Sequence, residues 1–129
     1  MADMLTFELV SPERKLAAVE ATAVTVPGQE GDLTAMANHA PFLTTLRPGF
    51  VSVDGGTGGR YFVTGGFAEI SNNTVSVLAE EAIEADKMDT AYLETKVADA
   101  ERFLSEAGED RAQAAMQRLN DFRAVSAQV

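Results

Sequence analysis

The sequence contains no cysteine, and His39 is the one histidine among its 129 residues. Without cysteine the chain can form no disulfide, has no thiol nucleophile and cannot bind zinc or an iron–sulfur cluster through thiolates. One histidine cannot make a histidine-rich metal site either. These absences exclude cysteine enzymes and the common structural metal centres, and we expect neither a metal nor a cofactor.

Basic residues are scarce: ten Lys and Arg stand against twenty Asp and Glu, which gives a formal net charge of −10. This charge repels the phosphate backbone, so we expect no nucleic acid partner. No apolar run approaches the roughly 20 residues that a membrane span needs, and residues 1–10 lack the pattern of a secretion signal. We therefore expect no membrane insertion and a chain that stays in the compartment where it is made.

A catalytic constellation is also missing from the sequence. Serine, aspartate and histidine all occur, but no Gly-x-Ser-x-Gly turn presents a serine nucleophile. The glycines of DGGTGGR, residues 54–60, lack the following Lys-Ser/Thr of a phosphate-binding loop, and the next residues are typical of a strand. We interpret this segment as a hairpin loop and the chain as a protein that is not itself an enzyme.

Short segments with alternating apolar residues fill the first two thirds of the chain, and each predicts a half-buried strand. They cover residues 5–10, 22–26, 49–54, 60–64, 67–71 and 74–78. Turn-forming residues separate them at Pro27-Gly28, Pro48-Gly49, Asn72-Asn73 and 55–59. Strands of this length and spacing favour a β-sandwich or a β-barrel.

Near residue 85 the pattern changes to the helical period. Asp86 is a plausible N-cap of a first helix, and Asp89 adds negative charge to its first turn. The apolar face of this helix consists of Leu93, Val97, Ala100 and Leu104, with Phe103 beside them. Gly108 is expected to end it. A second helix begins with the acidic pair at 109–110, and its apolar face consists of Ala112, Ala115, Met116, Leu119 and Phe122. Two amphipathic helices joined so closely predict an antiparallel hairpin.

Two features have no immediate explanation. The segment GQEGDL, residues 28–33, is predicted to be a polar loop that carries Glu30 and Asp32, and it is either a binding loop or simply solvated. His39 stands beside a proline turn, and a hydrogen-bonded structural role is the better interpretation on composition alone.

Three blocks of sequence resemble the bacterial epsilon subunits of F-type ATP synthases. They are residues 9–16 (LVSPERKL), 24–51 and 62–89. The second block has Val-Pro-Gly, Gly-Asp-Leu, Asn-His-Ala-Pro and Leu-Arg-Pro-Gly in the family's order and spacing. The resemblance implies an N-terminal β-sandwich of about ten strands, residues 1–85, and a C-terminal antiparallel two-helix hairpin, residues 86–129.

The resemblance also implies a function: a non-catalytic subunit of the central stalk, or rotor, that links the gamma subunit to the c-ring and couples proton flow to ATP synthesis. Such a subunit is peripheral, on the cytoplasmic face of the bacterial inner membrane. The residues that the resemblance puts against the c-ring loops are Gln29, Glu30, Gly31 and Asp32. His39 and Thr44 are expected to lie toward gamma. The alternative is a stand-alone acidic module that binds an unrelated protein.

The C-terminal helices depart from the family pattern in two ways. Several bacterial relatives begin the first helix with the nucleotide-binding pattern Ile/Leu-Asp-x-x-Arg-Ala, and here Asp89 is kept while Tyr92 and Leu93 replace the arginine and the alanine. The charged phosphate donor is lost, so we expect no nucleotide site. The second helix, a candidate contact with the alpha/beta catalytic head, balances three arginines with three acids, and we expect weak regulation of ATP hydrolysis at most.

Overall fold

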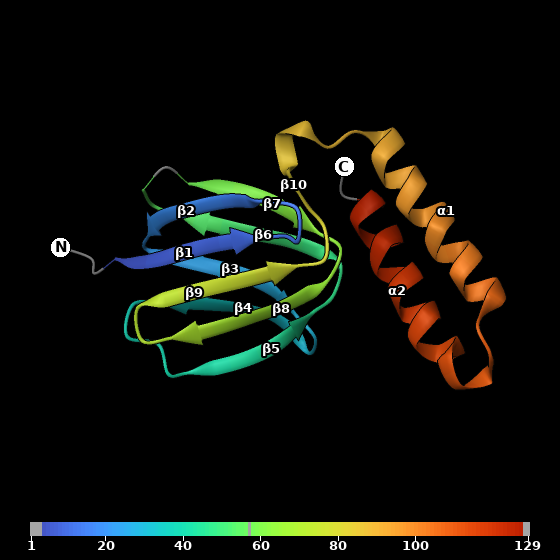
Figure 1. Ribbon diagram of the computed structural model, residues 1–129, viewed down its shortest axis with the longest axis horizontal. Helices are drawn as coiled ribbons and strands as arrows, with labels where there is room; N and C mark the ends of the chain where they lie inside the picture. The colour runs from blue at the N-terminus through green and yellow to red at the C-terminus, as the bar shows by residue number, and fades with distance from the viewer. Residues whose placement is uncertain (1–3, 57, 128–129) are drawn as a thin grey trace. The chain divides into compact units, whose positions relative to one another are not determined.

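The computed structural model describes residues 4–56 and 58–127. The chain divides between Asp86 and Lys87 into two compact units, one built of β-strands and one of helices (Figure 1). Each unit is described by itself below.

The β-unit contains ten strands in the part of the chain that is described. Their bounds are β1 Leu5–Val10, β2 Lys15–Ala21, β3 Ala23–Gly28, β4 Gly31–Met36, β5 Phe42–Leu46, β6 Gly49–Asp54, β7 Gly59–Val63, β8 Gly66–Ser71, β9 Thr74–Ala79 and β10 Ala82–Glu84. Strands β1, β3, β6, β7, β8 and β9 confirm the predicted segments to within 2 residues at each end. Strands β2, β4, β5 and β10 were not predicted.

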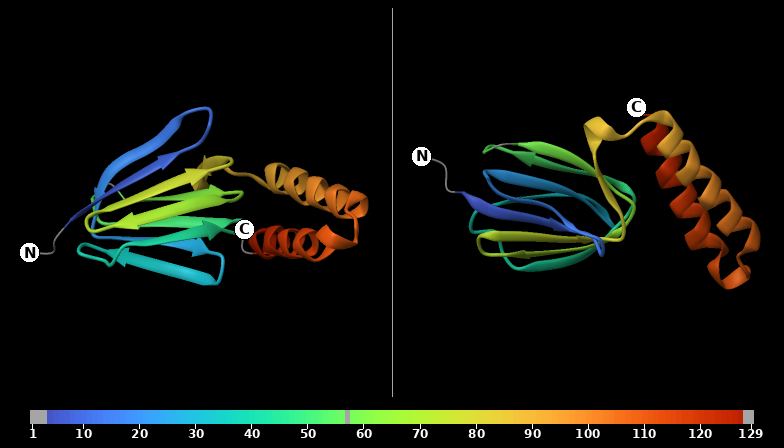
Figure 2. Two further views of the ribbon diagram at one scale, coloured as in Figure 1. Left: turned by 60° about the horizontal axis from the view of Figure 1, so that its bottom comes forward. Right: turned by 45° about the horizontal axis from the view of Figure 1, so that its top comes forward.

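The strands form one folded sheet in the order β10-β7-β6-β3-β5-β8-β9-β1-β2, with β4 paired to the other side of β3. Strand β3 changes partner along its length: its first residues pair with β6, whereas Gly28 pairs with Leu46 of β5. The sheet folds at this change, so that β4, β3, β6, β7 and β10 form one layer and β5, β8, β9, β1 and β2 form the other (Figure 2). This arrangement confirms the predicted β-sandwich.

The predicted break at Pro27-Gly28 is wrong, because β3 runs through both residues and pairs them with Asp32 and Gly31 of β4. Proline has no N–H to donate, but Pro27 lies between the part of β3 that pairs with β6 and the part that pairs with β5. The missing donor is tolerated there. Its carbonyl accepts a hydrogen bond of 3.0 Å from the N–H of Arg47.

The other predicted turns are confirmed. Asn72 and Asn73 connect β8 to β9, and β6 begins at Gly49 directly after Pro48. The glycine-rich segment connects the antiparallel strands β6 and β7, as a hairpin loop should. Thr57 in this loop lies outside the described residues.

The apolar core lies between the two layers. On β1 the alternation is regular: Leu5, Phe7 and Leu9 are at most 2% exposed. The core side chains that join them from both layers include Val24, Val26, Val51, Val53, Val63, Ala68, Ile70, Val75 and Val77. The centroid of the Phe7 ring lies 6.2 Å from that of Tyr61 in the opposite layer, and burial raises the pKa of the Tyr61 phenol above 10.0. The dense core makes the sandwich a rigid body.

The helical unit is an antiparallel hairpin of α1, Thr90–Glu106, and α2, Glu109–Ala127. The buried residues of the two helices are Leu93, Ala100, Ala115, Leu119, Phe122 and Val125. Most of these buried residues belong to the apolar faces predicted from the sequence. Met116 and Phe103, which the sequence analysis placed in or beside these faces, are not buried: their side chains are 45% and 50% exposed. Val125 is buried and was not predicted.

The ends of the helices also differ from the prediction. Asp86 belongs to a short 3-10 helix, Ala85–Lys87, and is not the N-cap of α1. Asp89 is the N-cap of α1, and its Oδ1 accepts a hydrogen bond of 2.8 Å from the N–H of Tyr92. Gly108 lies between the two helices: α1 already has its C-cap at Ala107, and the Gly108 carbonyl, directly before α2, accepts from the N–H of Arg111 at 3.0 Å.

None of the helices in the described residues is long and apolar enough to cross a membrane. Within the same residues, His, Asp and Glu side chains form no group of three or more that could hold a metal ion.

Candidate functional site

The segment GQEGDL forms a tight hairpin between two strands, and this corrects the prediction of a six-residue loop. Gly28 ends β3, β4 begins at Gly31, and only Gln29 and Glu30 stand outside the strands. Two glycines are needed for this geometry. A Cβ on Gly28 would lie 2.7 Å from the Gly31 carbonyl oxygen, and Gly31 has a φ of +139°, which side chains disfavour. The hairpin therefore presents Gln29 and Glu30 at a fixed position.

Arg47 fastens this hairpin to the end of β5. Its Nη2 donates to Oδ1 of Asp32 at 2.6 Å, and its Nε donates to the Gly28 carbonyl at 3.2 Å. The N–H of Gln29 adds a hydrogen bond of 2.9 Å to the Thr45 carbonyl. Surface ion pairs contribute only about 0.2–1 kcal/mol to stability, so the effect of Arg47 is mainly to hold the hairpin in one orientation. The sequence analysis missed this residue, although it lies in the Leu-Arg-Pro-Gly motif.

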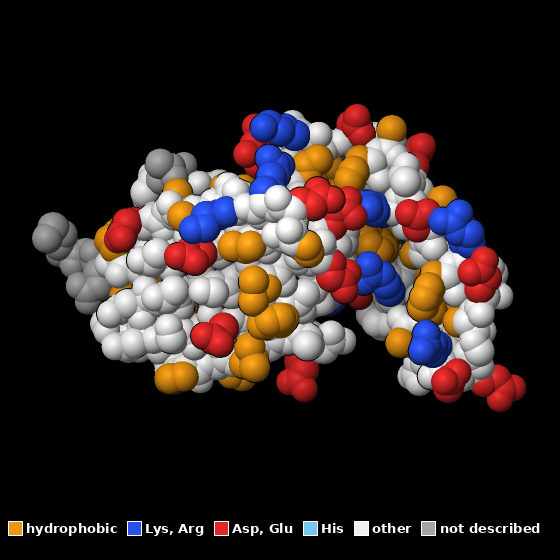
Figure 3. Space-filling model, viewed as in Figure 1, with side chains coloured by type: hydrophobic (Ala, Val, Ile, Leu, Met, Phe, Trp, Pro, Cys, Tyr) orange, Lys and Arg blue, Asp and Glu red, His pale blue; other side chains and the backbone are white. Residues whose placement is uncertain are grey.

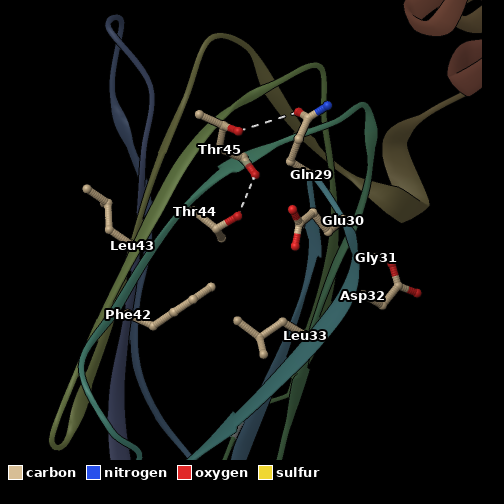
Figure 4. A pocket seen from close by; sticks show the side chains of 10 residues that line it. Gln29, Glu30, Gly31, Asp32, Leu33, Phe42, Leu43, Thr44 and Thr45 are labelled. Atoms are coloured by element: carbon tan, nitrogen blue, oxygen red, sulfur yellow. Dashed lines mark hydrogen bonds between the residues drawn. The ribbon is translucent and has the colours of Figure 1, made fainter.

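A hollow with a volume of about 620 Å³ opens between β4 and β5. Strands β4 and β5 are the edges of the two layers. The layers are joined where Gly28 of β3 pairs with Leu46 of β5, and the hollow lies where they separate beyond this pair. Its lining is residues 28–33 and 42–45 (Figure 4). Leu33 and Phe42 give it apolar walls, and Thr44 adds a hydroxyl that donates to the Thr45 carbonyl at 3.0 Å.

The two acidic side chains of the hairpin point in different directions. Glu30 points toward Thr44 across the hollow, whereas Asp32 points away from it toward Arg47 (Figure 4). The Glu30 carboxylate makes no hydrogen bond and no ion pair with any residue that the structure describes. The hollow thus combines apolar walls with an unpaired carboxylate.

The residues predicted to face gamma lie apart from each other. Thr44 lines the hollow together with Gln29, Glu30, Gly31 and Asp32. His39 lies in the connection between β4 and β5, at the opposite end of these strands from the hairpin. It is half-buried, and its Nδ1 is 2.7 Å from the Ala40 carbonyl oxygen, as the structural interpretation of this histidine predicts.

A second surface of interest lies on the outer face of the β5-β8-β9 layer. Leu43, Phe67 and Leu78 are 63%, 41% and 43% exposed. Leu43 and Thr45 are two residues apart on β5, so their side chains point to the same face. Thr45 pairs with Phe67, and Phe67 pairs with Leu78, so Leu43, Phe67 and Leu78 share that face. Figure 3 shows hydrophobic side chains gathered over these strands. We call Leu43, Phe67 and Leu78 the apolar stripe. Contiguous exposed apolar surface of this kind marks interaction sites.

The start of α1 is used for folding. The carboxylate of Asp89 accepts a hydrogen bond from the N–H of Tyr92, and Leu93 is buried inside the helical unit, with 1% of its surface exposed. The hollow between α1 and α2, about 460 Å³, includes Glu94 and Glu101, and the Arg123 guanidinium is already 4.0 Å from Glu101. Two carboxylates against one guanidinium leave this hollow with a net negative charge, which does not favour phosphate.

Comparison with known proteins decides the family. Residues 4–85 match the family model described as ATP synthase, Delta/Epsilon chain, beta-sandwich domain. The chain is 50% identical to an ATP synthase epsilon chain of Fuscovulum blasticum over 98% of this chain and 97% of that one. It is 52% identical to that of Ruegeria sp. (strain TM1040), over 88% and 83% of the two chains. The chain belongs to the ATP synthase epsilon chain family.

This membership confirms the resemblance found in the sequence. Epsilon chains are non-catalytic stalk subunits, which confirms that the chain is not itself an enzyme. The membership also decides against the alternative interpretation, a stand-alone module that binds an unrelated protein.

Solved structures agree on the fold. A chain of the Euglena gracilis mitochondrial ATP synthase, solved as OSCP/F1/c-ring in rotational state 1, superposes with a TM-score of 0.74 at 22% identity, covering 97% of this chain and 81% of that one. A chain of the Tetrahymena thermophila mitochondrial ATP synthase central stalk/c-ring gives a TM-score of 0.63 at 17% identity, covering 95% and 96% of the two chains.

Proposed function

We propose that this chain links the gamma subunit to the c-ring in the central stalk of a bacterial proton-translocating ATP synthase, on the cytoplasmic face of the inner membrane. Torque passes between two partners only if both grip one rigid body. The observation that carries the proposal is that a single densely packed sandwich bears two surfaces, the fastened hairpin with its hollow and the apolar stripe, which adjoin at Leu43. The family to which the chain belongs supports it further.

The hairpin is the proposed contact with the c-ring loops, through Gln29, Glu30, Gly31 and Asp32. A contact that transmits torque must not bend, and a two-residue turn tied to β5 by Arg47 meets this requirement. Because Thr44 shares the hollow with Glu30, we assign it to the same contact.

The apolar stripe is the proposed contact with gamma. A partner with its own apolar surface would remove these side chains from water, which stabilises a complex by about 25 cal/mol per Å² of apolar surface. His39 stays a proposed gamma contact from the family resemblance.

The proposal is tested by mixing the full chain with its cognate gamma subunit and following both by gel filtration. We expect a stoichiometric complex and no ATPase activity from the chain alone, because it lacks a catalytic constellation. Separate elution of the two proteins at micromolar concentration, or turnover of ATP by the isolated chain, would contradict the proposal.

We further propose that the helical hairpin does not sense ATP. Titration of the full chain with ATP should show no saturable binding at micromolar concentrations, since Tyr92 stands where the pattern requires arginine. A charged hydrogen bond typically contributes about 1.5–3 kcal/mol, or roughly ten- to a hundredfold in affinity. Tyr92→Arg is the matched variant that returns the charge. Saturable micromolar binding by the unaltered chain would refute this proposal.

The same helices are proposed to inhibit ATP hydrolysis only weakly. The charge of α2 is balanced, so little attraction draws it toward an acidic surface of the catalytic head, and Leu119 and Phe122 hold it in the hairpin. A complex assembled with a chain that lacks residues 90–129 should hydrolyse ATP at nearly the rate of the complete complex. A several-fold rise in hydrolysis would show that the helices inhibit strongly.

A further inference from the structure

We infer that the hollow between β4 and β5 receives one long basic side chain, lysine or arginine, from the surface that the hairpin contacts. The inference rests on the proposed function, in which that surface belongs to the c-ring. It assigns an occupant to the hollow and separates the roles of the two hairpin carboxylates.

The first argument is charge. Asp32 and Arg47 form an ion pair of 2.6 Å, so their charges cancel locally. Glu30 has no such partner among the described residues, and its carboxylate points across the hollow toward Thr44 (Figure 4). The charge that the hairpin offers to a partner is therefore the single negative charge of Glu30, and a cation complements it.

The second argument is the shape and polarity of the walls. Leu33 on β4 and Phe42 on β5 line the hollow, and the Phe42 side chain is 50% exposed. Lysine and arginine carry an aliphatic stem below a charged head, so the stem can cover these apolar walls while the head reaches Glu30. An arginine head can in addition stack on the Phe42 ring. An acidic, a purely polar or a short side chain would leave either the carboxylate or the apolar walls without a partner.

The third argument is preorganisation. The hairpin is held by Arg47 through the Gly28 carbonyl and Asp32, and the Thr45 hydroxyl lies 3.4 Å from Oε1 of Gln29. Glu30 is thus presented from a fixed turn, and little conformational entropy is lost when a side chain enters.

The test is the binding of the full chain to membrane vesicles that carry its ATP synthase depleted of this subunit, measured at several NaCl concentrations. Glu30→Gln should bind about ten- to a hundredfold more weakly at low salt, and its binding should lose most of its salt dependence. Glu30→Asp keeps the charge and should lose less affinity. Phe42→Ala should weaken binding and leave the salt dependence in place.

One variant serves as a control, and a second compares the two carboxylates of the hairpin. Asp54→Asn removes the same charge from an exposed residue at the opposite end of β3, where Asp54 pairs with Ala23, and should bind like the unaltered chain. Asp32→Asn removes a charge already met by Arg47 and should change the salt dependence less than Glu30→Gln. Circular dichroism confirms that each variant is folded.

The inference is overturned if Glu30→Gln binds like Asp54→Asn, or if it weakens binding equally at every salt concentration. It is also overturned if only Phe42→Ala has an effect, which would indicate an apolar occupant. Failure of the unaltered chain to bind the depleted vesicles would instead refute the proposed function.

Discussion

Replacing Leu43 and Phe67 together by glutamate is expected to weaken the complex with gamma by at least about a hundredfold. Both side chains are exposed in the isolated chain and belong to the apolar stripe, so their loss removes apolar surface that gamma would cover. Each new carboxylate would in addition have to leave water without a partner. Isothermal titration of gamma with the variant measures the effect.

Met36→Glu is the matched control for this prediction. Met36 is 60% exposed, like the stripe residues, but it lies on β4 in the other layer of the sandwich. This variant should bind gamma normally. An equal loss for Met36→Glu, or normal binding by the double variant, would show that gamma does not dock on the stripe.

Reversing both hairpin charges, with Glu30→Lys and Asp32→Lys, is expected to uncouple the enzyme. A lysine at position 32 would repel Arg47, now 2.6 Å from Asp32, and so release the hairpin from β5. A lysine at position 30 would repel the cation proposed to occupy the hollow. Proton-driven ATP synthesis in reconstituted vesicles should fall several-fold while ATP hydrolysis continues.

The control carries the same change in net charge at the other end of the sandwich. Glu20→Lys with Asp54→Lys alters exposed residues that pair with Thr6 of β1 and Ala23 of β3. This variant should remain coupled. Unchanged coupling in the Glu30, Asp32 variant would mean that the hairpin is merely solvated.

The sequence predicted best the strands that bury one complete face. In β1, Leu5, Phe7 and Leu9 alternate with more exposed residues, and the period of two is plain. Edge strand β4 was missed because Ala35 is its one fully buried residue among those described. Strand β5 was missed for a related reason: its apolar residues Phe42 and Leu43 are adjacent and both exposed. Their exposure serves the surface of the molecule, so they show no core alternation.

The candidate site was predicted in part. Glycine and acidic residues identified the hairpin, but the sequence does not reveal that Arg47 lies 2.6 Å from Asp32, because their meeting depends on β5 pairing with the end of β3. The cap of α1 shows a similar limit. Asp86 and Asp89 are equally good capping residues by type. Asp89 is the N-cap in the structure, and Leu93, the first buried residue of α1, lies one turn after it.

The most direct test of the account is to return the full chain to ATP synthase vesicles depleted of this subunit and to measure proton-driven ATP synthesis together with ATP hydrolysis. The account predicts that synthesis rises and saturates at a stoichiometric amount of the chain, because one rigid body then joins gamma to the c-ring. Binding of the chain with no gain in synthesis would contradict the account.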